Sequence, residues 1–146
     1  MKKILMLCTS LFLLTGCSLL GEVNSSLEYA DTATGYVSTV KEFANEVPSL
    51  SQDAVADSEA MKTLETELQT MKTEIENFNE TEPPQIAEGV HDKIVSSNQK
   101  LLDGIDVSLK NIEDGTFDPS VIEDSEIMKT IDNITSLTNQ IEKLGN

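Results

Sequence analysis

The chain has 146 residues, with ten lysines, no arginine and 26 acidic residues, so its formal net charge is −16. A surface this acidic repels phosphate backbones, which excludes nucleic-acid binding through a basic patch. Without arginine, no guanidinium can hold a phosphate or carboxylate in a bidentate manner. The single histidine leaves little material for a catalytic triad or a histidine-based metal site.

The N-terminal residues have the layout of a bacterial lipoprotein signal. Two lysines precede an apolar run from Ile4 to Leu14. This run is shorter than the roughly 20 residues that a membrane-spanning helix needs, but it has the length of a signal-peptide core. The following Leu14-Thr15-Gly16-Cys17 matches a lipobox, in which small residues precede the cleaved bond and the cysteine thiol accepts a diacylglyceryl group. We predict a signal peptide over 1–16, cleavage between Gly16 and Cys17, and a lipid on Cys17; an ordinary secretory signal is the alternative.

Cleavage changes the charge and the cysteine content of the chain. Residues 1–16 contain two of the ten lysines, no acid and Cys8, so the net charge falls from −16 to −18. Cys17 carries the lipid, which leaves no thiol for a disulfide. Each buried acyl methylene contributes about 0.8 kcal/mol, and two chains anchor a protein stably. We therefore expect the membrane to be a partner through acyl chains such as palmitate, with no other cofactor, and the protein to lie on the outer face of the cell membrane.

The mature chain shows apolar residues at spacings of three and four, the pattern of amphipathic helices. It predicts a first helix over about Glu22 to Val47, ended by Pro48. A second follows over about Asp53 to Phe78, and Pro83 and Pro84 break the chain after it. The predicted core residues of these two helices are Val23, Leu27, Ala30, Val37, Val40, Phe43, Ala44 and Val47, then Met61, Leu64, Leu68, Met71, Ile75 and Phe78.

The second half of the chain predicts two further helices. One covers about Gln85 to Asp114, with Gly115 as its C-terminal glycine. Asp118-Pro119 is a helix-start signal for a short turn, and the last helix covers about Ser125 to Leu144, closed by Gly145. Their predicted core residues are Ile86, Val90, Ile94, Leu101, Ile105, Leu109 and Ile112, then Ile127, Ile131, Ile134, Leu137, Ile141 and Leu144.

These patterns predict an all-α fold without a sheet, since no segment alternates with period two. We expect an antiparallel four-helix bundle as one domain over 22–146, preceded by a lipidated linker over 17–21. The first helix has the weakest propensity because Gly35 interrupts it and threonines surround that glycine. The alternative is therefore a first helix that serves as a stalk on a three-helix body.

His91 and Glu88 are weak candidates for a metal site. Their Glu-x-x-His spacing places both on one helical face, as in di-metal bundle proteins. Such centres need a second histidine, which the chain lacks. A mononuclear site with acids from a neighbouring helix remains open, but a histidine on the helix surface or boundary is the favoured interpretation, so no metal is expected.

A group of acidic residues in the second half of the chain does not match a calcium loop. With Gly115 at the invariant glycine position of an EF-hand, Lys110 and Ile112 occupy ligand positions and Val121 the bidentate one. A solvated acidic surface explains the group better than weak binding of calcium or magnesium. Its members are Asp103, Asp106, Glu113, Asp114, Asp118, Glu123, Asp124 and Glu126.

The mature chain contains no Gly-x-Ser-x-Gly nucleophile elbow. With one histidine and no arginine, the parts for nucleophile activation and oxyanion stabilisation are missing. We therefore expect a protein that is not an enzyme.

Several short stretches resemble one family. They are the lipobox and its continuation Ser18-Leu19-Leu20-Gly21-Glu22-Val23-Asn24, then Phe43-Ala44-Asn45-Glu46, Glu82-Pro83-Pro84, Leu101-Leu102-Asp103-Gly104-Ile105-Asp106 and Ile141-Glu142-Lys143-Leu144-Gly145. Over essentially the whole chain these residues look like the small, all-helical, uncharacterised lipoproteins of bacilli. The resemblance implies a Gram-positive source and no known activity. The resulting hypothesis is a non-catalytic interaction module of the cell envelope; the alternative is a lipoprotein that binds a small ligand or a metal ion.

Overall fold

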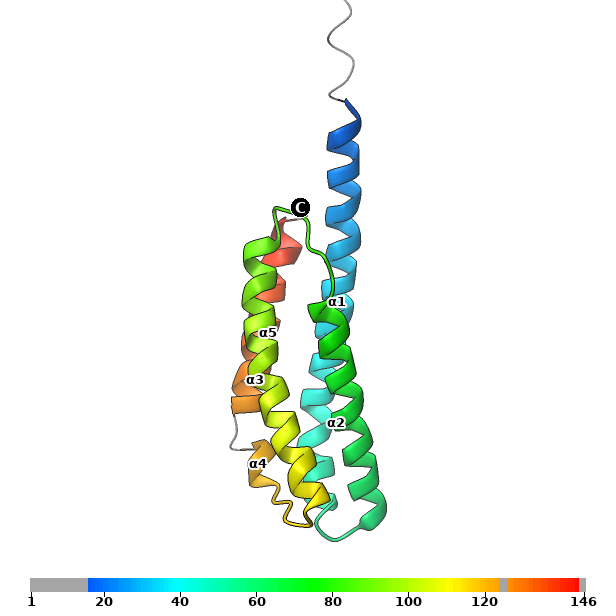
Figure 1. Cartoon of the computed structure of the whole chain (residues 1–146), viewed down its shortest axis with the longest axis vertical. Coiled ribbons are helices and arrows are strands. Elements are labelled where there is room, and N and C mark those ends of the chain that lie inside the picture. The colour runs from blue at the N-terminus through cyan, green and yellow to red at the C-terminus, as the bar shows by residue number, and fades with distance from the viewer. Residues whose placement is uncertain (1–15, 124–125, 145–146) are drawn as a thin grey trace, which may run out of the picture.

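The computed structural model describes the backbone of residues 16–123 and 126–144, and the side chains of residues 25–122 and 127–137. Within these ranges the chain forms helices and no strand, which confirms the all-α prediction (Figure 1). The helices are α1 (Gly16–Asp53), α2 (Ser58–Asn79), α3 (Glu88–Glu113), the one-turn α4 (Ser120–Glu123) and α5 (Glu126–Leu144).

The four long helices form a closed ring. Helices α1 and α3 each pack against both α2 and α5, so α1 and α3 face each other across the bundle. Successive long helices run in opposite directions, and the N-terminal part of α1 extends beyond the end of the bundle (Figure 1). The antiparallel four-helix bundle is thus confirmed. The alternative of a stalk on a three-helix body is wrong, because α1 is a full member of the bundle; its first turns alone project from it.

Pro48 lies inside α1, so the prediction that it ends the first helix is wrong. The helix continues to Asp53. A proline inside a helix costs about 3 kcal/mol, but residues on both sides of Pro48 are buried against the other helices, including Val47 and Ser51. The Ser51 hydroxyl also donates a hydrogen bond to the Pro48 carbonyl at 2.8 Å. Burial of this last segment therefore keeps the chain helical past the proline.

Side-chain caps explain two of the helix boundaries. Helix α2 begins at Ser58, five residues later than predicted, because the Asp57 side chain accepts a hydrogen bond from the Glu59 N–H at 2.8 Å. The Asp118 side chain likewise accepts from the Ser120 N–H at 2.9 Å at the start of α4. That cap confirms Asp118 as a helix-start residue.

The end of α3 confirms the predicted role of Gly115. This glycine has φ +66°, the left-handed conformation that favours glycine. Its N–H donates to the Ile112 carbonyl at 3.1 Å, and the Thr116 N–H donates to the Asn111 carbonyl at 2.9 Å. These two bonds are those of a Schellman motif, which closes the helix.

Most predicted core residues are buried, with two corrections. Leu27 is 53% exposed, because it lies on the face of α1 opposite Tyr29, which is buried. Ile86 is 60% exposed, because α3 begins only at Glu88 and Ile86 lies in the turn before it. The predictions for Gly145 and for residues 1–15 lie outside the described residues, as do those for the side chains of Val23, Ile141 and Leu144.

Gly104 allows the close approach of α3 and α5. A Cβ atom on this residue would lie 2.6 Å from Cγ1 and 2.9 Å from Cδ1 of Ile127, and Ile127 is itself buried. The glycine is therefore required by packing, although glycine costs about 0.5–1 kcal/mol in a helix relative to alanine.

We predict that Gly104→Ala lowers the free energy of unfolding by about 1–3 kcal/mol, because the added methyl overfills the α3–α5 contact. The matched control is Gly35→Ala. That position in α1 is exposed, and a Cβ atom added there would have no neighbouring atom within 4 Å, so this variant should gain about 0.5–1 kcal/mol from helix propensity. Urea unfolding followed by circular dichroism measures both changes. Equal effects of the two variants would contradict the packing argument.

Candidate functional site

The predicted lipidation site lies at the far end of the projecting part of α1. Helix α1 begins at Gly16, so the backbone of Cys17 is in its first turn, and the predicted linker 17–21 is helical. Tyr29 is the first buried side chain among the described residues of α1. At 1.5 Å per residue, about 18 Å of helix separates Cys17 from Tyr29. Among the described residues, no helix combines the length and the apolar character that crossing a bilayer requires.

In the part of the chain that the structure describes, His91 and Glu88 are not joined by further candidate metal ligands. Among the described residues, no three histidine, cysteine, aspartate or glutamate side chains gather closely enough to hold a metal ion. Glu88 is exposed, whereas His91 is only 5% exposed. The expectation of a surface or boundary histidine is therefore wrong: His91 lies in the bundle interior, where α3 faces α1.

The acidic group does not converge on a common point either. Asp106 pairs with Lys72 of α2 at 2.6 Å, and Asp114 pairs with Lys110 at 3.0 Å. Asp118 caps α4, and the N–H group of Ser120 lowers the pKa of its carboxyl. The described members of the group are exposed, in agreement with a solvated surface. Asp124 and the side chains of Glu123 and Glu126 lie outside the described residues.

The interior around His91 holds a cluster of aromatic and polar side chains, which we call the aromatic–amide cluster. His91 Nδ1 and the Tyr29 hydroxyl are hydrogen-bonded at 2.9 Å. The two rings meet edge to face, with centroids 5.8 Å apart, and the Phe78 ring lies 5.3 Å from the imidazole. The cluster consists of Tyr29, Tyr36, Phe78, Asn79, His91 and Asn98.

The second half of the cluster is a chain of hydrogen bonds. The Tyr36 hydroxyl donates to Asn98 Oδ1 at 2.6 Å, and the Asn98 amide donates to Asn79 Oδ1 at 2.7 Å. The Tyr36 ring stacks on Phe78 with centroids 4.2 Å apart and an angle of 14°. Asn98 is fully buried, so these bonds satisfy both ends of its amide in a place without access to bulk water.

The spacing of the cluster follows from the topology. Tyr29 and Tyr36 are one heptad apart on α1, and His91 and Asn98 are one heptad apart on α3, so both hydrogen-bonded pairs have a sequence separation of 62. A constant offset is expected for diagonal helices that run in the same direction. The tyrosine pair and the His91–Asn98 pair are therefore detectable as matching heptads, a signal that a search restricted to aliphatic residues misses.

Burial changes the acidity of the cluster. It lowers the pKa of His91 below 6.5, and the nearby Asp92 carboxylate opposes this shift. Burial also raises the pKa of Tyr29 to about 12 and raises the pKa of Tyr36 further. At neutral pH the cluster is therefore uncharged, so it contains no ion that would need a counter-charge inside the bundle.

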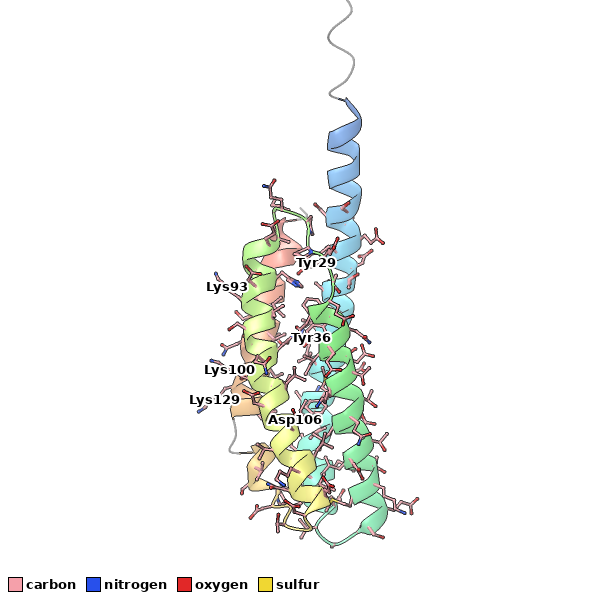
Figure 2. The ribbon with its side chains drawn as sticks, viewed as in Figure 1. Tyr29, Tyr36, Lys93, Lys100, Asp106 and Lys129 are labelled. Carbon is pink, nitrogen blue, oxygen red and sulfur yellow. The ribbon has the colours of Figure 1, made fainter. Side chains whose placement is uncertain are left out.

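A small pocket adjoins the cluster. It has a volume of about 250 Å³ and lies between α1 and the α2–α3 connection. Figure 2 shows Tyr29 near the end of the bundle from which α1 projects. The pocket is lined by Ser25, Glu28, Tyr29, Thr32, Thr81 and Glu82. The Tyr29 phenol in this lining stays protonated at neutral pH, because burial raises its pKa to about 12, and its hydroxyl is hydrogen-bonded to His91.

We predict that Tyr36→Phe lowers the free energy of unfolding by about 1–3 kcal/mol. The variant keeps the stacking on Phe78 but leaves the buried Asn98 carbonyl without its donor. Ser38→Ala on the same helix is the control, since its exposed hydroxyl bonds only to the Thr34 carbonyl and its loss should cost less than about 0.5 kcal/mol. Chemical denaturation measures both. A cost for Tyr36→Phe no larger than that of the control would contradict the cluster's role.

We also predict that His91 titrates below 6.5 in the folded protein. Because His91 is the single histidine, its imidazole signals in a proton NMR titration of the untagged chain need no mutant for assignment. The unfolded chain then binds more protons than the folded one below 6.5, so the His91 contribution to stability is complete above that pH and is lost as the pH falls toward the folded pKa. His91→Gln should lack this part of the pH dependence. A folded pKa at or above 6.5 would contradict the prediction.

The comparisons with known proteins agree with the resemblance described above. Over residues 29–144 the chain matches the model of a "Family of unknown function (DUF6376)". It is 38% identical over 147 residues, 99% of each chain, to the "Uncharacterized lipoprotein YybP" of Bacillus subtilis (strain 168). No solved structure matches. The match begins at Tyr29, the first buried side chain described in α1, and the chain belongs to the Family of unknown function DUF6376.

Proposed function

We propose that the protein is a lipoprotein of the cell envelope, held on the outer face of the cell membrane by a lipid on Cys17. In this proposal residues 1–16 are a signal peptide removed by cleavage after Gly16, residues 17–21 lead from the lipid, and residues 22–146 are the working domain. The match to a lipoprotein over nearly the whole chain supports this assignment.

The geometry of α1 is the observation that carries the proposal. A single helix extends from Gly16 to Asp53, so the residue that would bear the lipid and the bundle belong to one element. A flexible tether would let the domain rotate freely at the membrane, whereas a helix directs it. With this connection, one end of the bundle faces the membrane and its sides face the surrounding envelope.

We infer that the domain acts by binding and not by catalysis. The buried histidine and both tyrosines are used in the aromatic–amide cluster, whose uncharged groups stabilise the interior. A partner in the envelope is the leading hypothesis. The second candidate, a small-ligand-binding lipoprotein, is favoured by a polar groove between α3 and α5. Its metal-binding form gains no support from the described residues, which hold no three-ligand group.

We predict that Cys17→Ala moves the protein from the membrane fraction to the soluble or secreted fraction, because the acyl chains that supply the membrane affinity are lost. Cys8→Ala is the matched control: it removes a cysteine from the same segment but leaves the lipobox intact, so it should fractionate with membranes as the parent does. Fractionation and metabolic labelling with a fatty acid measure both. A labelled, membrane-bound Cys17→Ala protein would disprove the anchor.

A further inference from the structure

The outer side of the bundle carries a groove between α3 and α5. Its volume is about 340 Å³, and it is lined by Lys93, Ser96, Ser97, Asn133, Ser136 and Leu137. Five of these six residues are polar, and none of them is acidic. In a chain with 26 acidic residues and ten lysines, a groove with a lysine and no carboxylate in its lining is a distinct chemical environment.

Two further lysines extend this groove along the bundle. Because α3 and α5 are antiparallel neighbours, residues one turn after Ser97 on α3 and one turn before Asn133 on α5 lie on the continuation of the same rows. These residues are Lys100 and Lys129. Figure 2 shows Lys93, Lys100 and Lys129 on the same side of the molecule, pointing away from the bundle. We call these three residues and the groove lining the lysine groove.

The lysines of the groove are available for a ligand. Among the described side chains, Lys72 and Lys110 are engaged in ion pairs with Asp106 and Asp114, and no such pair involves Lys93, Lys100 or Lys129. Asp103 and Asp132 follow Lys100 and Lys129 by three residues; Asp103 accepts a hydrogen bond from Gln99 at 3.1 Å, and neither lines the groove.

The lining matches a ligand that carries both hydroxyl and anionic groups. Serine hydroxyls and an asparagine amide donate and accept hydrogen bonds, as recognition of a polyol requires. Lysine binds phosphate as a point charge. Lys93 and Lys100 are seven residues apart, about 10 Å along α3 at 1.5 Å per residue, so the positive charges suit a ligand with more than one anionic group. Leu137 is the one aliphatic residue among the six that line the groove.

We propose that the lysine groove binds a polyol phosphate, as a free molecule or as a repeating phosphodiester chain. The proposal rests on the proposed function in one respect, because it names the ligand of the envelope-facing domain. The net charge of the chain repels anions at long range, so binding depends on several local contacts acting together. A chain that spans Lys93, Lys100 and Lys129 is therefore favoured over a molecule with one phosphate.

The test is a calorimetric and NMR titration of the full-length protein in a non-ionic detergent. The probes are glycerol 3-phosphate, a synthetic glycerol phosphate hexamer joined by phosphodiesters, and uncharged hexaglycerol. We expect the hexamer to bind, with amide shift changes concentrated in 93–100 and 129–137, and hexaglycerol to bind at least about tenfold more weakly. Equal binding of hexamer and monomer would assign the site to a free polyol phosphate, and hexamer binding alone to a polymer; both support the proposal.

Two double variants with the same change in net charge separate the groove from general electrostatics. Lys93→Gln with Lys129→Gln should weaken hexamer binding about tenfold, because two charge-assisted contacts are lost. Lys41→Gln with Lys62→Gln, which alters exposed lysines of α1 and α2, should change it less than about twofold. Equal losses in both doubles, no binding by any phosphate probe, or equal binding of hexaglycerol would overturn the proposal.

The lipid site is distinct from the groove, so the two proposals can fail separately. Cys17→Ala should bind the hexamer as tightly as the parent. If it does so while remaining in the membrane fraction, the anchor is disproved and the groove stands. If it fractionates as a soluble protein but neither form binds a phosphate probe, the groove is disproved and the anchor stands.

Discussion

The hydrogen-bonded pairs across the bundle interior are the constraint on which the rest of the structure depends. Aliphatic residues on four helices can pack in more than one register, because one leucine or isoleucine layer resembles the next. A buried amide or imidazole has no such freedom, since an unpaired polar group in the interior costs about 1–3 kcal/mol. Tyr29 must meet His91 and Tyr36 must meet Asn98. A shift of α1 by one heptad along α3 would re-form one tyrosine–polar pair at most and would leave one tyrosine and one buried polar side chain unpaired, so the cluster favours one alignment.

Different contacts fix the alignment of different helix pairs. The labelled Tyr29 and Tyr36 of the aromatic–amide cluster lie toward the end from which α1 projects (Figure 2), whereas α3 and α5 approach each other closely at Gly104. Polar pairing thus determines the alignment of α1 with α3, and close approach determines that of α3 with α5. Together these contacts position both walls of the lysine groove, because the groove is formed by α3 and α5 themselves.

Helix number, direction and most of the core are predictable from the spacing of aliphatic residues, but that spacing lacks tertiary information. Pro48 predicts a helix end because its local cost is real, but burial of Val47 and Ser51 outweighs it. Leu27 fits the spacing of apolar residues in the sequence, but it is exposed because α2 and α5 cover the opposite face of α1, which carries Tyr29. His91 is polar and therefore predicts a peripheral position, because the tyrosine that satisfies it lies 62 residues away. The lysine groove is lined by residues of two helices, so the sequence pattern of neither helix alone predicts it.

The length of the projecting helix explains how an acidic domain can be anchored at a membrane whose headgroups repel it. A mature net charge near −18 opposes contact with anionic headgroups. About 18 Å of α1 separates Cys17 from Tyr29, the first buried side chain among the described residues, and the Debye length at physiological ionic strength is about 8 Å. The interaction between the bundle and the membrane surface is therefore screened over roughly two Debye lengths. A shorter helix would place the acidic domain within reach of the headgroups, whereas a flexible linker of the same residues would let it collapse toward them or tumble. In the proposed arrangement, the helix keeps the charged body at a distance from the headgroups and holds its sides, including the lysine groove, toward the envelope.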